Sequence, residues 1–152
     1  LPAVVAEHFP ADLARQAIMG HSMGGHGALT VGLTLADRFA AVSAFAPIAA
    51  PSDVPLGQKA LRGYLGDDRS AWRKHDAVAL IEDGARAPSL LVDQGTADEF
   101  LDQLKPELLE RACADAGIEL TLRMQPGFGH SYYFISSFMA EHLAWHAERL
   151  AT

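Results

Sequence analysis

Short hydrophobic runs alternate along the whole chain with segments of helical periodicity. Four of the runs, each bounded by glycine, proline or polar residues, predict strands at residues 14–19, 40–46, 87–93 and 119–125. The other patterned segments predict helices at residues 2–8, 24–36, 76–82, 106–116 and about 131–150. Strands that alternate with helices form parallel β-α-β units, so the chain is predicted to be an α/β protein with a mostly parallel sheet flanked by helices.

One irregular segment interrupts this pattern. Residues 51–72 lose regular periodicity, but their aromatic residues Tyr64 and Trp72 need burial. We therefore predict a packed excursion over the edge of the sheet that carries the site. Asp76 stands where it can cap the helix that runs through Glu82.

The joint between the first strand and the next helix contains the motif G-x-S-x-G at residues 20–24. In this nucleophile elbow the serine occupies a tight, strained turn, so we expect that a Cβ at Gly20 or Gly24 would strike its neighbours. The turn raises the Ser22 hydroxyl out of the sheet, and the Met23 N–H at the helix start points to where an oxyanion would form. The alternative is an ordinary serine in a glycine-rich loop. Three further glycines of the helix are expected to allow its close approach to the sheet: Gly25, Gly27 and Gly32.

Composition limits the classes of function. The 152 residues suffice for one domain, and 49% of them are hydrophobic. A net charge of −7 and the lack of basic runs argue against nucleic-acid binding. No apolar run is long enough to cross a bilayer, and no cleavable signal is visible. The chain starts at Leu1, so the question whether a targeting segment precedes it stays open. Cys113 is the sole cysteine, which fits a reducing compartment, and we expect it to pack inside a helix.

Three polar residues follow predicted strand ends, where open parallel sheets bind their ligands. They are Ser22, Asp98 and His130, in the chain order of the α/β-hydrolases. His130 can take the Ser22 proton during attack, and Asp98 can orient the imidazole and stabilise its cation. Asp93 is expected within its strand and Asp102 in the next helix, so neither is the preferred acid.

The remaining histidines receive structural interpretations. His21 and His26 flank the serine, but we expect the elbow to direct both side chains away from it, for packing or hydrogen bonding. His142 and His146 have a spacing that can bind a metal, yet the residues between them lack the glutamate of a zincin motif. A solvated or partly buried helix face is the preferred interpretation there, and no metal site is predicted.

Several blocks together resemble the S-formylglutathione hydrolase (esterase D) family of the α/β-hydrolase superfamily. The blocks lie at residues 20–29, 42–48, 63–66, 93–101, 125–127 and 129–135, and they cover nearly the whole chain in the family's order.

The resemblance implies a serine thioesterase that hydrolyses S-formylglutathione to formate and glutathione, the last step of glutathione-dependent formaldehyde detoxification. It implies the triad Ser22, Asp98 and His130, a cytoplasmic enzyme without cofactor or metal, a small-molecule partner and a homodimer. Tyr64, Trp72 and Tyr132 are candidates for walls of the substrate pocket, with core packing as the alternative. The rival functions are a broad carboxylesterase or acyltransferase of the same fold, and an inactive truncated hydrolase-like module.

The chain departs from the family in length, because family members are about twice as long. Residues 1–152 correspond to the C-terminal part of a single α/β-hydrolase domain, without the first strands of the sheet. The second oxyanion-hole donor would lie in the absent part, so only Met23 supplies one here. We expect the first strand to expose an apolar edge, and the 152 residues alone to be unstable or inactive.

Overall fold

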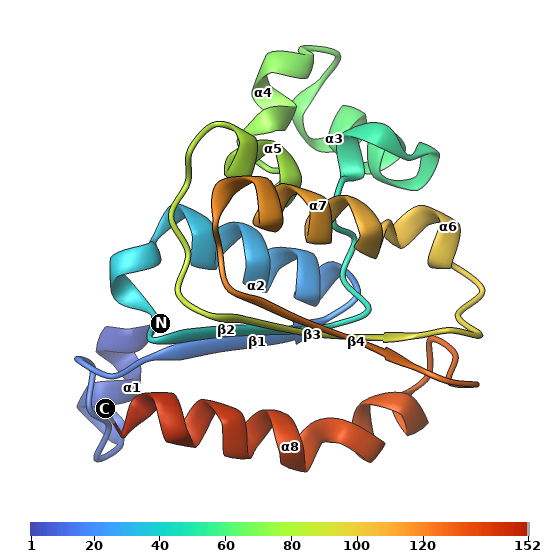
Figure 1. The fold of residues 1–152 in the computed structure, drawn as a ribbon. Helices are drawn as coiled ribbons and strands as arrows, with labels where there is room; N and C mark the ends of the chain where they lie inside the picture. Colours follow the sequence, from blue (N-terminus) through green and yellow to red (C-terminus); the bar gives the residue numbers. More distant parts are fainter. Residues whose placement is uncertain (152) are drawn as a thin grey trace.

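The computed structural model describes residues 1–151 and contains a four-stranded sheet between two layers of helices (Figure 1). All neighbouring strands are parallel, and their spatial order follows the chain: β1 (Ala17–His21), β2 (Ala41–Phe45), β3 (Leu90–Gly95) and β4 (Leu120–Gln125). One face of the sheet is covered by α2 (Met23–Thr34), α5 (Ala77–Glu82) and α7 (Pro106–Ala116), and the other by α8 (Tyr132–Leu150). The predicted parallel sheet flanked by helices is confirmed.

The remaining helices among the described residues complete the architecture. They are α1 (Pro2–His8), η1 (Ala36–Arg38), η2 (Pro51–Asp53), α3 (Pro55–Leu65), α4 (Arg69–Arg73) and α6 (Leu101–Leu104). The excursion predicted at residues 51–72 is therefore largely helical. Trp72 is buried as expected and donates a hydrogen bond to the Gly66 carbonyl at 2.9 Å. The expected burial of Tyr64 is wrong, since this side chain is 79% exposed near the end of α3.

The strand boundaries shift where local hydrogen bonds compete with the sheet. β1 begins three residues later than predicted, because the Asp12 carboxylate accepts from the Ala14 N–H and from Arg15 and forms a turn there. The predicted cap of α5 is confirmed: Asp76 accepts from the Ala79 N–H at 3.0 Å. Cys113 is buried in α7 as expected, and burial raises the pKa of its thiol to about 11.

Burial differs sharply between the central and the outer strands. Every residue of β2 and β3 is buried, as befits parallel strands covered on both faces, whereas β1 and β4 are half exposed. Close packing of α2 on the sheet depends on Gly32, where a Cβ would stand 2.5 Å from Val42 Cγ2. Gly25 is also tightly packed, but a Cβ at Gly27 would meet nothing within 4 Å, so the expectation for Gly27 is wrong.

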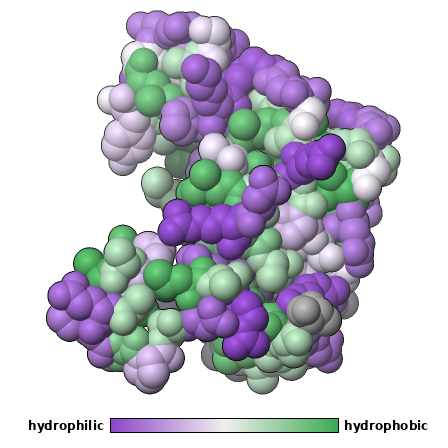
Figure 2. All heavy atoms as spheres, turned by 90° about the vertical axis from the view of Figure 1, so that its left-hand side faces the viewer, coloured by the Kyte–Doolittle hydropathy of each residue, from purple (hydrophilic) through white to green (hydrophobic). Residues whose placement is uncertain are grey.

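The outer edge of β1 has no strand beside it among residues 1–151. Several hydrophobic side chains in β1 and in the segment that precedes it are exposed, including Phe9 at 65%, Leu13 at 39% and Met19 at 37%. Figure 2 looks at the end where the strands begin, and hydrophobic atoms stand at the surface there among hydrophilic ones. The apolar edge is present as expected, while its effect on the stability of the chain stays a prediction.

Candidate active site

The elbow between β1 and α2 holds Ser22 in a conformation that few residues adopt. Its backbone has φ 55° and ψ −117°, so the serine lies outside the regions that L residues normally occupy. A Cβ at Gly20 would lie 2.1 Å from the Gly24 carbonyl oxygen, which explains the glycine there. A Cβ at Gly24 would meet nothing within 4 Å, so the steric expectation is right for Gly20 and wrong for Gly24.

The three residues that the sequence selected lie together at the carboxyl ends of the strands. Ser22 Oγ lies 2.8 Å from His130 Nε2, and His130 Nδ1 lies 2.7 Å from Asp98 Oδ2. The simplest assignment of hydrogens has the Ser22 hydroxyl donating to Nε2 and the Nδ1–H donating to the carboxylate. Ser22 and His130 are 108 residues apart in the chain. The fold thus forms a continuous hydrogen-bonded line from a hydroxyl to a buried carboxylate.

Asp98 is fixed by its own partners. The Phe100 N–H donates to Oδ1 at 2.8 Å, and Gln94 Nε2 donates to Oδ2 at 3.0 Å. Because the aspartate is only 6% exposed, these donors and His130 replace the water that would otherwise solvate it. Asp93 lies inside β3 and Asp102 in α6, as predicted.

The His130 ring is held on its faces as well as at its nitrogens. The His21 ring lies with its centroid 4.6 Å away at an interplanar angle of 42°, and the Phe100 ring lies 5.1 Å away at 74°. His21 therefore has the packing role that was expected, and the ring on which it packs is that of His130. His26 Nδ1 lies 3.2 Å from the Ile48 carbonyl, in agreement with its predicted hydrogen-bonding role.

A pocket of about 610 Å³ opens beside Ser22 and His130. Most of its wall is hydrophobic, and α3 contributes more of the lining residues than any other element, with further contributions from the loop before α6 and from α6 itself. Tyr64 borders it, whereas Trp72 and Tyr132 are not among its lining residues. The site thus combines the hydrogen-bonded residues Ser22, His130 and Asp98 with an apolar cavity, the usual composition of a small-molecule site.

The helix that follows the serine brings backbone donors to the same place. Met23 is the first residue of α2, and the first N–H groups of a helix have no acceptor within it. They are therefore available for a negatively charged oxygen near Ser22.

A second serine, histidine and aspartate array lies sealed between the sheet and α8. Ser43 Oγ is 2.9 Å from His142 Nδ1 and 2.7 Å from His146 Nε2, and His142 Nε2 is 3.2 Å from Asp93 Oδ2. Arg123 donates two bonds of 2.6 Å to Asp93. The expectation of a solvated or partly buried face for His142 and His146 is wrong, since they are 0% and 6% exposed.

Burial and hydrogen bonding determine how this buried array titrates. Burial by itself raises the pKa of Asp93, but hydrogen bonds from His142, Arg123 and Gln125 outweigh it and hold the pKa below the usual value. Burial, with smaller contributions from His142 and Arg149, lowers the pKa of His146 to about 4. Ser43 itself is 0% exposed, so no substrate can reach it, and the array holds α8 on the sheet.

Within residues 1–151, no group of three or more histidine, cysteine or acidic side chains is arranged to hold a metal ion. No helix in the same range is both long and apolar enough to span a membrane.

A family model described as "Putative esterase" matches residues 1–145. The chain belongs to this esterase family. The S-formylglutathione hydrolase of Paracoccus denitrificans (strain Pd 1222) is 52% identical over 150 residues, which are 99% of this chain and 54% of that protein. The chain therefore spans about half the length of that relative.

Solved structures agree with the family assignment. An S-formylglutathione hydrolase from Agrobacterium tumefaciens superposes with a TM-score of 0.95 at 57% identity, over 98% of this chain and 54% of that one. An S-formylglutathione hydrolase from Staphylococcus aureus shares the fold at 23% identity and a TM-score of 0.76, over 95% of this chain and 59% of that one.

Proposed function

We propose that this esterase chain carries the catalytic triad of a serine thioesterase that hydrolyses S-formylglutathione to formate and glutathione. Ser22 is the nucleophile, His130 the general base, Asp98 the orienting carboxylate and the Met23 N–H an oxyanion donor. The observation that carries the proposal is the hydrogen-bonded line from Asp98 through His130 to Ser22 at the mouth of a pocket. We take the substrate from the relatives at 52% and 57% identity, both of which are called S-formylglutathione hydrolase.

The reaction proceeds by acyl transfer through a covalent intermediate. Ser22 Oγ attacks the formyl carbon while its proton passes to His130 Nε2, and the oxyanion is held by the Met23 N–H. The carbon–sulfur bond breaks, and glutathione leaves as a thiolate that takes the proton from His130, so that His130 is neutral again. His130 then removes a proton from water, whose oxygen attacks the formyl ester, and the proton returns to Ser22 Oγ as formate departs.

Accessibility favours Ser22 over Ser43 as the nucleophile. Both serines bond to a histidine that bonds to an aspartate, but Ser22 lines the pocket and Ser43 is fully buried in β2. The strained backbone at position 22 also exposes the hydroxyl, as in other nucleophile elbows.

The two serines provide a matched test of this proposal. S-formylglutathione hydrolysis and labelling by a fluorophosphonate probe are measured on the longer protein of which we propose these residues to be the C-terminal part, and on its Ser22→Ala and Ser43→Ala variants; this longer protein is the parent chain of the experiments below. We expect Ser22→Ala to abolish both signals and Ser43→Ala to retain labelling while lowering stability. Labelling that survives Ser22→Ala, or a folded chain that is never labelled, would refute the assignment and favour an inactive hydrolase-like module.

The apolar pocket supports a second candidate, a carboxylesterase of broader acyl range. Its walls include Leu56, Leu61 and Leu65, which suit a hydrocarbon group and contribute nothing to binding formyl, the smallest acyl group. Comparing kcat/KM for S-formylglutathione and p-nitrophenyl acetate decides between them. A strong preference for the simple ester would favour the carboxylesterase.

We further propose that residues 1–152 are the C-terminal part of a single α/β-hydrolase domain, and that a second oxyanion donor lies outside them. The reaction requires no cofactor or metal, so a chelator leaves the rate unchanged. The acidic net charge of −7 and the single cysteine fit a cytoplasmic enzyme that binds neither nucleic acid nor membrane. The assembly is a homodimer, for which light scattering after gel filtration is the direct measurement.

A further inference from the structure

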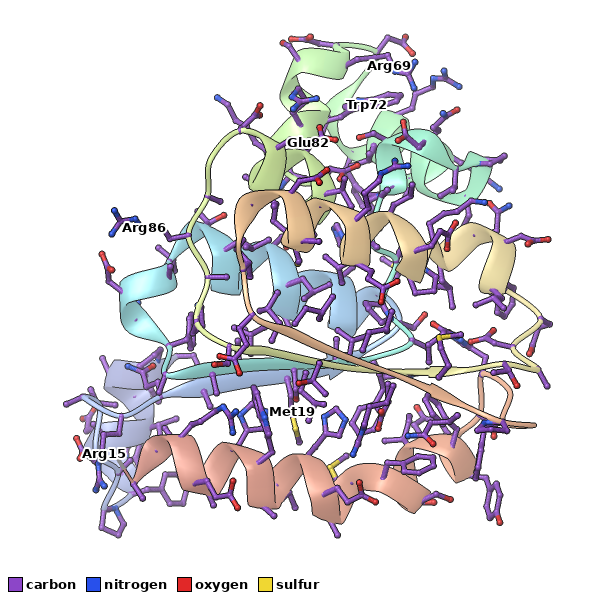
Figure 3. The ribbon with its side chains drawn as sticks, in the orientation of Figure 1. Arg15, Met19, Arg69, Trp72, Glu82 and Arg86 are labelled. Atoms are coloured by element: carbon purple, nitrogen blue, oxygen red, sulfur yellow. The ribbon has the colours of Figure 1, made fainter. Side chains whose placement is uncertain are left out.

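His21 occupies a position that the proposed reaction leaves without a role. It is the last residue of β1 and immediately precedes Ser22. Alternation along a strand puts it on the same side as Met19, which Figure 3 labels in the layer between the sheet and α8. From there its ring lies against His130, with centroids 4.6 Å apart, and near Tyr132 at 6.4 Å.

The hydrogen bonds of His130 leave one rotation of its ring undetermined. Both bonds, to Ser22 and to Asp98, lie at the ring nitrogens and so define an axis through the imidazole. The bond from the ring to Cβ restricts rotation about that axis, and contacts on the ring faces restrict it further. The rings of His21 and Phe100 supply such contacts.

The surroundings of His21 favour its neutral form. Its Nε2 is buried and has no hydrogen-bond partner among residues 1–151, so a proton there would be an unsatisfied donor. Burial and the nearby His130 lower the pKa of His21, and Asp98 opposes this shift less strongly. The titratable groups that face it are His130, Asp98 and Tyr132. A neutral ring does not repel the imidazolium that His130 becomes during attack.

We propose that His21 is a positioning residue for His130: its uncharged ring fixes the tilt of the imidazole between Ser22 and Asp98. The proposal rests on the proposed function, since His130 must be the base whose orientation matters. His21 itself neither touches the reacting atoms nor moves a proton. An aromatic ring of any kind at this position should serve, and a side chain without a ring should not.

The test compares His21→Ala and His21→Phe, with His8→Ala as the control for losing an exposed histidine of α1. The second-order rate of Ser22 phosphonylation is measured well below each melting temperature. Because a misplacement of about 1 Å costs about 100-fold in rate, we expect His21→Ala to slow phosphonylation about 10- to 100-fold. The phosphonylation rates of His21→Phe and His8→Ala should stay within about threefold of the parent rate, because neither substitution displaces the His130 ring.

A second readout is independent of turnover. The His130 Nδ1–H, bonded to Asp98, should give a downfield proton resonance in the parent chain and in His21→Phe, and should broaden or vanish in His21→Ala. His21→Gln, which also lacks a ring, replaces the alanine variant if that variant does not fold.

The outcomes separate the two proposals. A ringless variant with an unchanged rate and resonance would overturn the role of His21, and so would a phenylalanine variant as impaired as the ringless one. If the parent chain shows the resonance but is not phosphonylated, the proposed function fails, and the resonance in the variants still decides the role of His21.

Discussion

Adding a single methyl group at Gly20 tests how the elbow is built. In Gly20→Ala the new Cβ would lie 2.1 Å from the Gly24 oxygen, 2.3 Å from the Gly24 carbon and 2.9 Å from the Gly25 nitrogen. These are backbone atoms, so no side-chain rotation relieves the clash. The start of α2 must move away from β1 by about 1 Å to restore an ordinary contact.

Two magnitudes follow from that displacement. Overpacking of this kind costs about 1–3 kcal/mol of folding free energy and occasionally more, which lowers the melting temperature by roughly 3–10 °C in a chain of this size. A shift of about 1 Å at the nucleophile costs about 100-fold in rate. We therefore expect Gly20→Ala to melt earlier and to react with a fluorophosphonate at roughly 1% of the parent rate.

The matched control is Gly24→Ala, because a Cβ there would meet nothing within 4 Å. Gly24 lies in the first turn of α2, where alanine is the better helix former, so we expect unchanged or slightly higher stability. Melting curves and labelling rates of both variants decide the matter. If Gly20→Ala melts and labels like the parent chain, or if both variants are equally impaired, the steric reasoning is refuted.

Three further predictions follow from the site and its surroundings. Asp98→Asn should reduce Ser22 labelling about 10²- to 10⁴-fold with little change in melting temperature, since the amide favours the wrong His130 tautomer; a rate within threefold of the parent would contradict this. Because the pKa of His146 is about 4 in the folded chain and near 6.5 when unfolded, the unfolded chain binds more protons between these values, and stability falls as the pH drops from about 6.5 toward 4. Urea melts at pH 7 and pH 5 should differ by about 1–2 kcal/mol in the parent, with this contribution absent in His146→Leu; equal pH slopes would refute it. Cys113, buried and with its thiol pKa raised to about 11, should react with a thiol reagent at pH 8 only after urea unfolds the chain, and fast labelling of the native chain would disprove that.

Much of the architecture follows from local sequence patterns. Short apolar runs between helical segments leave a parallel sheet as the arrangement that buries them, so the four strands and their parallel direction were predictable. The elbow is also a local feature, because it is specified by residues adjacent in the chain: the glycine at position 20 and a serine directly before a helix. Since parallel strands end at one edge, residues after the strands predicted at 87–93 and 119–125 were expected near Ser22. The sequence therefore indicated that Asp98 and His130 would meet it.

Other features depend on which face each residue presents, and local patterns leave this open. Apolar and polar side chains are spread around α8, so its sequence gave no sign that His142 and His146 face the sheet. Their partner Ser43 lies 99 and 103 residues away, in a strand whose other residues are all apolar.

Contacts across the chain likewise decided the roles of His21 and Tyr64. His21 meets His130 because the end of β1 and the loop after β4 converge beneath the elbow, which only the folded sheet determines. Tyr64 shares a face of α3 with the buried residues Gly57 and Leu61, but it borders the open pocket there and therefore stays exposed. Sequence by itself thus determined the strands and their parallel direction, the turn at Ser22 and the three polar residues at the carboxyl edge of the sheet. Tertiary structure alone decided which side chains surround them, because that depends on packing between segments far apart in the chain.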